Sequence, residues 1–105
     1  CVMPTRNGRN AMLFTAEGTM NMRNAKWAKD FSPIDPAGTS YVDTSYTKAY
    51  LHHLFKAKEF LAMQIASIHN LAFYLWLAGE ARRHILAGDF VAWKRDMVER
   101  MSRRL

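Results

Sequence analysis

The chain has 105 residues, half of them hydrophobic, and its 15 Lys and Arg against 9 Asp and Glu give a net charge of +6. This length suits one domain or part of one, and the apolar content excludes a disordered chain. The positive balance suits a polyanionic partner such as RNA or DNA, although an ordinary basic surface explains it equally well. The single cysteine excludes an internal disulfide and any site with several thiolates, which fits a reducing, cytoplasmic location.

The first ten residues, CVMPTRNGRN, have the pattern of a buried strand end followed by a polar loop. Arg6 and Arg9 stand three residues apart in that loop, and Asn7 between them can both donate and accept hydrogen bonds. Side chains of this kind can contact the edges of unstacked RNA bases. Without further context, solvated surface arginines are the preferred interpretation of the pair.

A small hairpin is predicted next, from the stretches at 11–15 and 19–25, with Gly18 at the turn between them. Residues 35–45, DPAGTSYVDTS, form a polar connection rich in residues that interrupt helices and strands. From Tyr46 onward the pattern predicts helix almost to the end of the chain.

Three helices are predicted after this connection, over residues 46–58, 59–86 and 89–103. The residues expected at their ends are Asp43, Thr44 or Ser45 before the first, Gly88 after the second and Asp89 before the third. On the first helix an aromatic stripe is expected, since steps of four and three residues share one face. Its members are Tyr46, Tyr50 and His53.

The run at 60–79 is long and apolar enough to resemble a membrane span. Four polar residues lie together at its centre, where hydrocarbon tolerates them least; they are Gln64, Ser67, His69 and Asn70. We therefore expect a helix buried in protein and no membrane partner.

Several short stretches occur in an order and spacing that point to a family. They are CVMPTRNGRN, LFT, N-x-RNAK, DFSPIDP and AYLHHLFKAKE…IHNLAFY, and they run through about residues 1–88. Together they resemble the C-terminal part of bacterial tRNA-guanine transglycosylase, also called queuine tRNA-ribosyltransferase. The resemblance implies an α+β fragment: the end of a (β/α)8 barrel with an inserted subdomain of a small antiparallel sheet plus helices. Residues 1–11 would end the last strand and form the tRNA-reading loop, 12–58 the subdomain and 59–105 the closing helices.

The resemblance also implies a reaction. In this family a carboxylate attacks the ribose of the wobble guanosine, a covalent intermediate forms, and a 7-deazaguanine precursor of queuosine replaces guanine in the tRNA. The aspartate that attacks precedes the position of Cys1, so we expect this segment to be inactive alone. A non-catalytic RNA-binding or dimerisation module derived from the family is the alternative.

Particular side chains acquire roles from the same resemblance. Arg6 and Arg9, with Asn7 beside them, match the positions that contact the uridines flanking the target guanine in the anticodon loop. Tyr46, Tyr50 and His53 match a helix near the contact between two subunits, although packing in the core is the more usual role of such a stripe. The implied partners are therefore tRNA, the precursor base and a second copy of the chain.

The sequence departs from the family at its usual zinc site. Relatives carry C-x-C-x-x-C and a histidine, whereas the cysteine positions here are Gly38, Ser40 and Asp43, and the histidine is His69. One carboxylate and one imidazole cannot complete a tetrahedral zinc site, so we predict no structural zinc and no other cofactor. A hydrogen bond between Asp43 and His69 is expected in its place; a bond from His69 to a backbone carbonyl is the equally weighted alternative.

Overall fold

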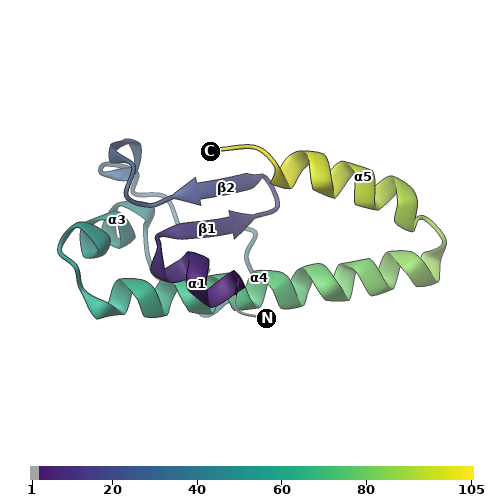
Figure 1. The fold of residues 1–105 in the computed structure, drawn as a ribbon, viewed down its shortest axis with the longest axis horizontal. Coiled ribbons are helices and arrows are strands. Elements are labelled where there is room, and N and C mark those ends of the chain that lie inside the picture. Colours follow the sequence, from purple (N-terminus) through teal and green to yellow (C-terminus); the bar gives the residue numbers. More distant parts are fainter. Residues whose placement is uncertain (1–2) are drawn as a thin grey trace.

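A 28-residue helix is the element on which the rest of the chain is assembled. The structure, a computed structural model, describes residues 3–105. Its elements are α1 (Met3–Arg9), β1 (Met12–Thr15), β2 (Gly18–Asn21), a 3-10 turn η1 (Ala25–Trp27), α2 (Tyr41–Ser45), α3 (Lys48–Lys56), α4 (Phe60–Ala87) and α5 (Phe90–Met101). The described residues thus form a mostly helical α+β fold with a two-stranded antiparallel sheet, as the sequence predicts (Figure 1).

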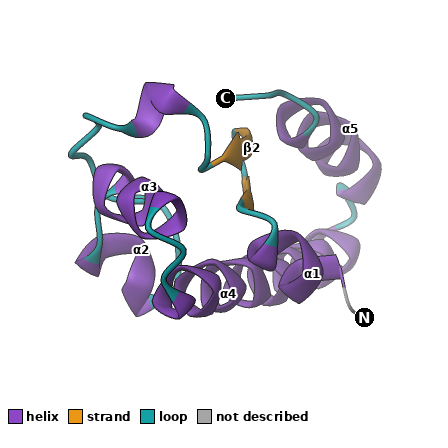
Figure 2. Cartoon of the chain, turned by 60° about the vertical axis from the view of Figure 1, so that its left-hand side comes forward, coloured by secondary structure: helices purple, strands orange, loops and turns teal. Residues whose placement is uncertain are grey.

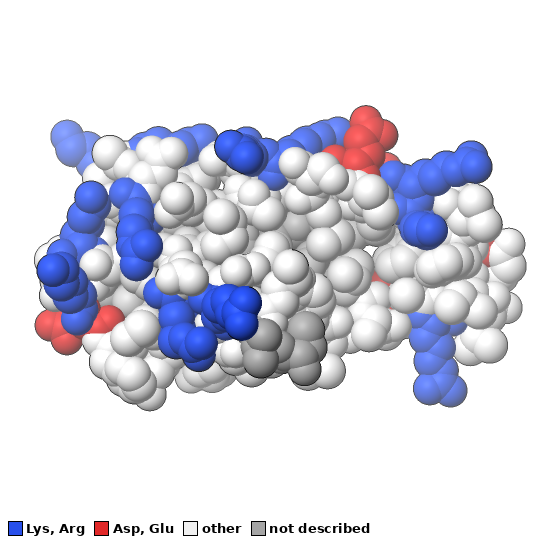
Figure 3. All heavy atoms as spheres, viewed as in Figure 1, with Lys and Arg blue, Asp and Glu red and all other residues white. Residues whose placement is uncertain are grey.

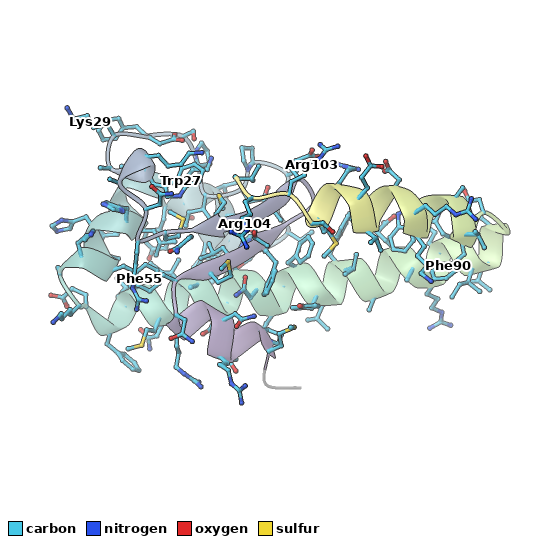
Figure 4. All side chains as sticks on the ribbon, turned by 45° about the horizontal axis from the view of Figure 1, so that its top comes forward. Trp27, Lys29, Phe55, Phe90, Arg103 and Arg104 are labelled. Atoms are coloured by element: carbon cyan, nitrogen blue, oxygen red, sulfur yellow. The ribbon has the colours of Figure 1, made fainter. Side chains whose placement is uncertain are left out.

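The structure confirms the predicted hairpin. In the antiparallel pairing of β1 with β2, Leu13 lies opposite Met20, and both side chains are buried. Alternation along each strand turns these residues to the interior and their neighbours outward. The C-terminal tail extends this small sheet, because Arg104 forms a parallel bridge with Thr19 of β2 (Figure 4).

The hydrophobic core lies between the hairpin, α3 and the N-terminal part of α4. Trp27 of η1 closes one side of it, and the indole Nε1 donates a hydrogen bond to the Asn21 carbonyl oxygen at 3.0 Å. The core side chains with the least exposed surface are Leu13, Met20, Met22, Ile34, Val42, Leu51 and Ile65. The buried residues of this core all lie between Ala11 and Ala66, so α5 contributes none of them.

Residues 3–9 form a helix, so the prediction of a strand end at Met3 and of a loop around the two arginines is wrong. Cys1 and Val2 lie outside the described residues. Pro4 is compatible with a first helical turn, where its missing N–H costs nothing. Gly8 allows α1 to press against α4, since a Cβ there would lie 3.0 Å from the Ser67 backbone nitrogen. Packing of α1 on α4 thus outweighs the turn-forming tendency of its Asn and Gly residues.

The polar connection contains a helix that the sequence did not predict. Ser40 begins α2 by accepting a hydrogen bond from the Val42 N–H, while the Asp43 carboxylate accepts one from the Ser40 N–H at 3.1 Å. Thr47 caps α3 by accepting a hydrogen bond from the Tyr50 N–H at 3.1 Å. The predicted cap at Asp43, Thr44 or Ser45 is therefore wrong, because the chain uses two separate caps where one was expected.

The corner between α4 and α5 begins at the predicted residue. Gly88 ends α4 with a φ of 83°, the left-handed conformation that favours glycine. Asp89 precedes α5 as predicted but makes no side-chain cap, and its carboxylate instead accepts a hydrogen bond from His84 Nδ1 at 2.7 Å. The His84 ring stacks on Trp93, with 5.0 Å between centroids, so the two helices are joined at this end.

α4 is less buried than its sequence led us to expect. Its buried residues all lie between positions 62 and 73, and 33% of its most apolar window is buried within the described chain. By length and composition alone, α4 is also the described helix that could cross a membrane. The hairpin and α5 lie on one side of it, so much of its apolar surface has no cover among residues 3–105 (Figures 1 and 2).

Candidate functional site

A buried pair of side chains joins the connection at 35–45 to α4. His69 Nδ1 donates a hydrogen bond to Asp43 Oδ1, and His69 Nε2 donates to the Phe14 carbonyl oxygen at 2.7 Å. Both side chains of the pair are almost fully buried. The two ring nitrogens face oxygen acceptors, which favours an imidazolium beside a carboxylate. Of the two alternatives left open by the sequence, the structure contains both: His69 bonds Asp43 and a backbone carbonyl at once.

The protonation of His69 is set by opposing effects. Burial lowers its pKa, but the hydrogen bond and charge of Asp43, the Phe14 carbonyl and the charge of Asp35 together raise the pKa above its ordinary value. The half-buried Asp35 has a raised pKa, chiefly because burial disfavours its carboxylate, with the charge of His69 opposing that effect. These contacts therefore favour the protonated form of His69.

The four positions that the resemblance aligned with zinc ligands lie close together in the structure. The Asp43 carboxylate contacts His69 through one oxygen and the Ser40 N–H through the other. Gly38 lies so close that a Cβ there would overlap this carboxylate. Any larger residue at 38 therefore requires Asp43 to move, and Asp43 is held on both oxygens.

Zinc does not fit this donor set. A structural zinc takes four ligands, and each histidine ligand must offer a free ring nitrogen. Both nitrogens of His69 are occupied by protein acceptors. Among residues 3–105, no three His, Cys, Asp or Glu side chains lie close enough to hold a metal ion. These residues can instead join the connection at 35–45 to α4 and β1 through the two hydrogen bonds of His69.

The raised pKa of His69 predicts a dependence of stability on pH. Between the pKa of an unfolded histidine, about 6.5, and the raised pKa of folded His69, the folded chain binds more protons than the unfolded chain. We therefore expect the free energy of unfolding to be highest below that window and to fall as the pH rises through it. Urea unfolding from pH 6 to pH 9 measures this. The His69→Gln variant serves as the control and should lack this part of the slope; equal slopes in both proteins would contradict the prediction.

The two arginines lie on the surface of α1. Arg6 and Arg9 are exposed in its last turn, and neither has an ion-pair partner among the described residues. Asn7 between them is half-buried. Lys and Arg side chains gather over α1 and, farther along, over α3 (Figure 3). The structure thus presents the arginines to solvent on a helix, free to contact an anion.

Asn70 positions α1, a role that the sequence did not reveal. Its side-chain nitrogen donates to the carbonyl oxygens of Pro4 at 3.0 Å and Met12 at 2.9 Å, and its Oδ1 accepts from the Phe14 N–H at 3.0 Å. Asn70 is fully buried. One side chain of α4 therefore fixes both α1 and β1. The available signal was a polar residue at the centre of an apolar run, which is retained only with partners.

The aromatic stripe lies partly on the surface. Tyr46 and Tyr50 stack with their ring centroids 5.7 Å apart, and Tyr46 packs against the edge of the core. Tyr50 and His53 are exposed on α3. The three residues do not form one core stripe, and the stacked pair leaves a flat aromatic surface open to solvent.

Comparison with known proteins identifies the family. A sequence model described as queuine tRNA-ribosyltransferase matches residues 1–103. The chain belongs to this family. A queuine tRNA-ribosyltransferase of Helicobacter acinonychis is 50% identical over 102 residues, which are 97% of this chain and 28% of the relative. The enzyme of that name from Desulfosudis oleivorans is 50% identical over 90% of this chain and 25% of its own length, and the Helicobacter pylori enzyme is 47% identical over 99% and 28%.

The match confirms the resemblance seen in the sequence and extends it. The short motifs reach only to about residue 88, whereas the family match includes α5. The chain spans about a quarter of the length of the curated relatives that it matches. On α4, Asn70 donates a hydrogen bond to the Pro4 carbonyl oxygen of α1, and the neighbouring His69 binds Asp43. α4 therefore links the helix that carries the arginine pair to the buried Asp43–His69 pair.

Proposed function

We propose that the chain is the C-terminal part of a tRNA-guanine transglycosylase, which exchanges the wobble guanine of tRNA for a 7-deazaguanine precursor of queuosine. The exchange proceeds through a covalent bond between an aspartate and the ribose. Family membership over residues 1–103 supports this function. The attacking aspartate, the general base and the base pocket belong to the other three quarters of the enzyme, where the barrel strands lie.

In this enzyme α1 presents Arg6 and Arg9 to the anticodon loop. The observation that carries this role is that both guanidinium groups are exposed on one short helix and have no ion-pair partner among residues 3–105. Guanidinium groups can bind base edges and phosphate with paired hydrogen bonds. Asn7 lies beside them and adds a polar contact, while Gly8 and Asn70 hold the helix in place.

The same parent enzyme is a homodimer in this proposal, with α3 at the contact. Tyr50 and His53 are exposed on this helix, and the Tyr46–Tyr50 stack offers a rigid aromatic surface. Aromatic side chains of this kind are enriched at the centres of protein interfaces. The Asp43–His69 pair holds the subdomain behind this surface in the place of the family's zinc.

A chimera tests the proposed function. The part of the Helicobacter pylori enzyme that precedes its matched segment is joined to this chain at Cys1. The purified chimera is expected to incorporate labelled guanine, and the aminomethyl-deazaguanine precursor, into tRNA with a wobble guanine. The matched control replaces the aspartate expected immediately before Cys1 with asparagine and should show no incorporation. A folded chimera that binds this tRNA without exchanging its base would contradict the enzymatic role and favour the RNA-binding module.

A further inference from the structure

The helix that carries the two arginines is too short to be stable alone. α1 has seven residues, whereas an isolated helix in water is marginal below about 12–15 residues. Its sequence, MPTRNGR, includes Asn and Gly, which favour helix weakly, and no acidic residue stands in its first turn. The conformation of α1, and with it the direction of Arg6 and Arg9, therefore depends on contacts with the rest of the fold.

The side of α1 opposite the arginines rests on α4, as Figures 1 and 2 show. Pro4 and Gly8 are the buried residues of α1, and their spacing of four places them on one face of the helix. A Cβ at Gly8 would lie 3.0 Å from the Ser67 backbone nitrogen, so the two backbones are in close contact. With 3.6 residues per turn, Arg6 and Arg9 lie across the helix from this face. A shift of α1 on α4 therefore moves both guanidinium groups together.

One side chain of α4 sets where α1 lies on this surface. Asn70 is fully buried, and its amide nitrogen donates to the carbonyl oxygens of Pro4 at 3.0 Å and Met12 at 2.9 Å. Its Oδ1 accepts a hydrogen bond from the Phe14 N–H at 3.0 Å. Both N–H groups and the carbonyl oxygen of the amide are thus bonded to backbone. Because Pro4 belongs to the first turn of α1 and Met12 begins β1, this amide fixes the helix relative to the hairpin.

The neighbouring residue of α4 keeps Asn70 in this orientation. His69 Nε2 donates to the Phe14 carbonyl oxygen at 2.7 Å, while Asn70 accepts from the N–H of the same residue. Consecutive side chains of α4 therefore bond both backbone polar groups of Phe14. β1 cannot slide along α4 without breaking both bonds, which would leave buried polar groups without partners. Asn70 thus contacts Pro4 from a fixed position.

We propose that Asn70 is a positioning residue for discrimination between tRNAs, acting through the two arginines of α1. Its bond to the Pro4 carbonyl oxygen sets the place and the rotation from which Arg6 and Arg9 bind base edges. This inference rests on the proposed function and assigns a new residue to it. A hydrogen bond to a base edge tolerates a change of only about 0.5 Å in its length, whereas attraction to phosphate acts over longer distances. Displaced arginines therefore lose discrimination before they lose affinity.

Asn70→Asp in the chimera described above tests the two amide donors. The variant has nearly the same shape and keeps an acceptor for Phe14, but it places a carboxylate oxygen against the carbonyl oxygens of Pro4 and Met12. The measured quantity is the ratio of kcat/KM between tRNA with uridines flanking the target guanine and tRNA with one of those uridines replaced. We expect the ratio to fall by about fivefold or more, the lower end of the range for one lost base contact.

Gly8→Ala tests the position of α1 without weakening its helix. Alanine favours helix more than glycine does, but its Cβ would press on the Ser67 backbone and push α1 away from α4. The ratio should fall in this variant as well. Trp27→Phe is the matched control for lost stability, because it removes the hydrogen bond from a buried indole to the Asn21 carbonyl oxygen and leaves α1 untouched. This control should lower the melting temperature and keep the full ratio.

A background without the arginines shows whether Asn70 acts through them. In the Arg6→Ala, Arg9→Ala double variant, Asn70→Asp should lower the ratio no further, because effects that share one contact do not add. Three results would overturn the proposal: a full ratio in both Asn70→Asp and Gly8→Ala, an equal fall in Trp27→Phe, or an undiminished effect of Asn70→Asp in the double variant.

The test separates this inference from the proposed function. If the chimera binds tRNA without exchanging its base, the ratio of dissociation constants for the same two tRNAs replaces the kinetic ratio, and the same outcomes decide. A ratio that Arg6→Ala and Arg9→Ala both leave intact would overturn the reading role of α1, and the role of Asn70 with it. A ratio that falls in the arginine variants but not in Asn70→Asp or Gly8→Ala would overturn the positioning role alone.

Discussion

Replacing His69 with alanine is expected to lower the free energy of unfolding of the chain by about 3–5 kcal/mol, the range found when one partner of a buried ion pair is removed. The variant leaves the Asp43 carboxylate buried beside an empty space, and the Phe14 carbonyl oxygen loses its donor. Burial of such groups without partners is costly. Urea unfolding followed by circular dichroism at pH 6 measures the loss.

His53→Ala is the matched control, because His53 is exposed on α3 and no ion pair involves it within residues 3–105. We expect that variant to change the free energy of unfolding by no more than about 0.5 kcal/mol, as is usual on a surface. A His69→Ala variant as stable as His53→Ala would contradict the role of the pair as a cross-link. Loss of stability of the unmodified chain in a chelator would instead assign His69 to a metal site.

The family resemblance predicted the meeting of Asp43 with His69 but not its consequences. The family pattern placed these two positions face to face, and the structure confirms it. The bond from His69 Nε2 to Phe14 could not be predicted, because it depends on how the hairpin lies on α4. That contact occupies the nitrogen that a metal would need, so it decides the chemistry of the site.

Local patterns succeeded where the chain itself fixes the conformation. The hairpin follows from its alternating residues and turn, and the end of α4 follows from the left-handed conformation of Gly88. Local patterns failed where contacts between residues distant in the sequence determine the conformation. Residues 3–9 have the composition of a loop, yet they form α1 because Gly8 packs on α4 and Asn70 binds Pro4. Ser40 and Asp43 form a capping box, which begins α2 within a connection that was expected to be irregular.

The exposure of α4 shows what a sequence pattern leaves open. An apolar run interrupted by polar residues predicts burial on every side, and the structure buries only part of it among residues 3–105. Which partner covers this surface depends on the whole protein, so the sequence of one segment cannot specify it.

Replacing Arg6 or Arg9 with alanine in the chimera is expected to weaken discrimination between tRNAs more than it weakens binding to tRNA in general. If each guanidinium binds a uracil edge, its loss removes about 1–3 kcal/mol of discrimination, roughly 5- to 150-fold in a ratio of kcat/KM. The measured ratio compares tRNA with uridines flanking the target guanine against tRNA in which one of those uridines is replaced.

Arg23→Ala is the matched control, since Arg23 is also exposed and has no ion-pair partner among residues 3–105, but lies beyond β2. That variant removes the same charge, so it can weaken binding through lost attraction to phosphate, equally for all tRNAs and less at high salt. Only variants of α1 should change the ratio. Arg6→Ala and Arg9→Ala variants that retain the full ratio while lowering affinity would assign the pair to phosphate, because contacts with the backbone carry no sequence information.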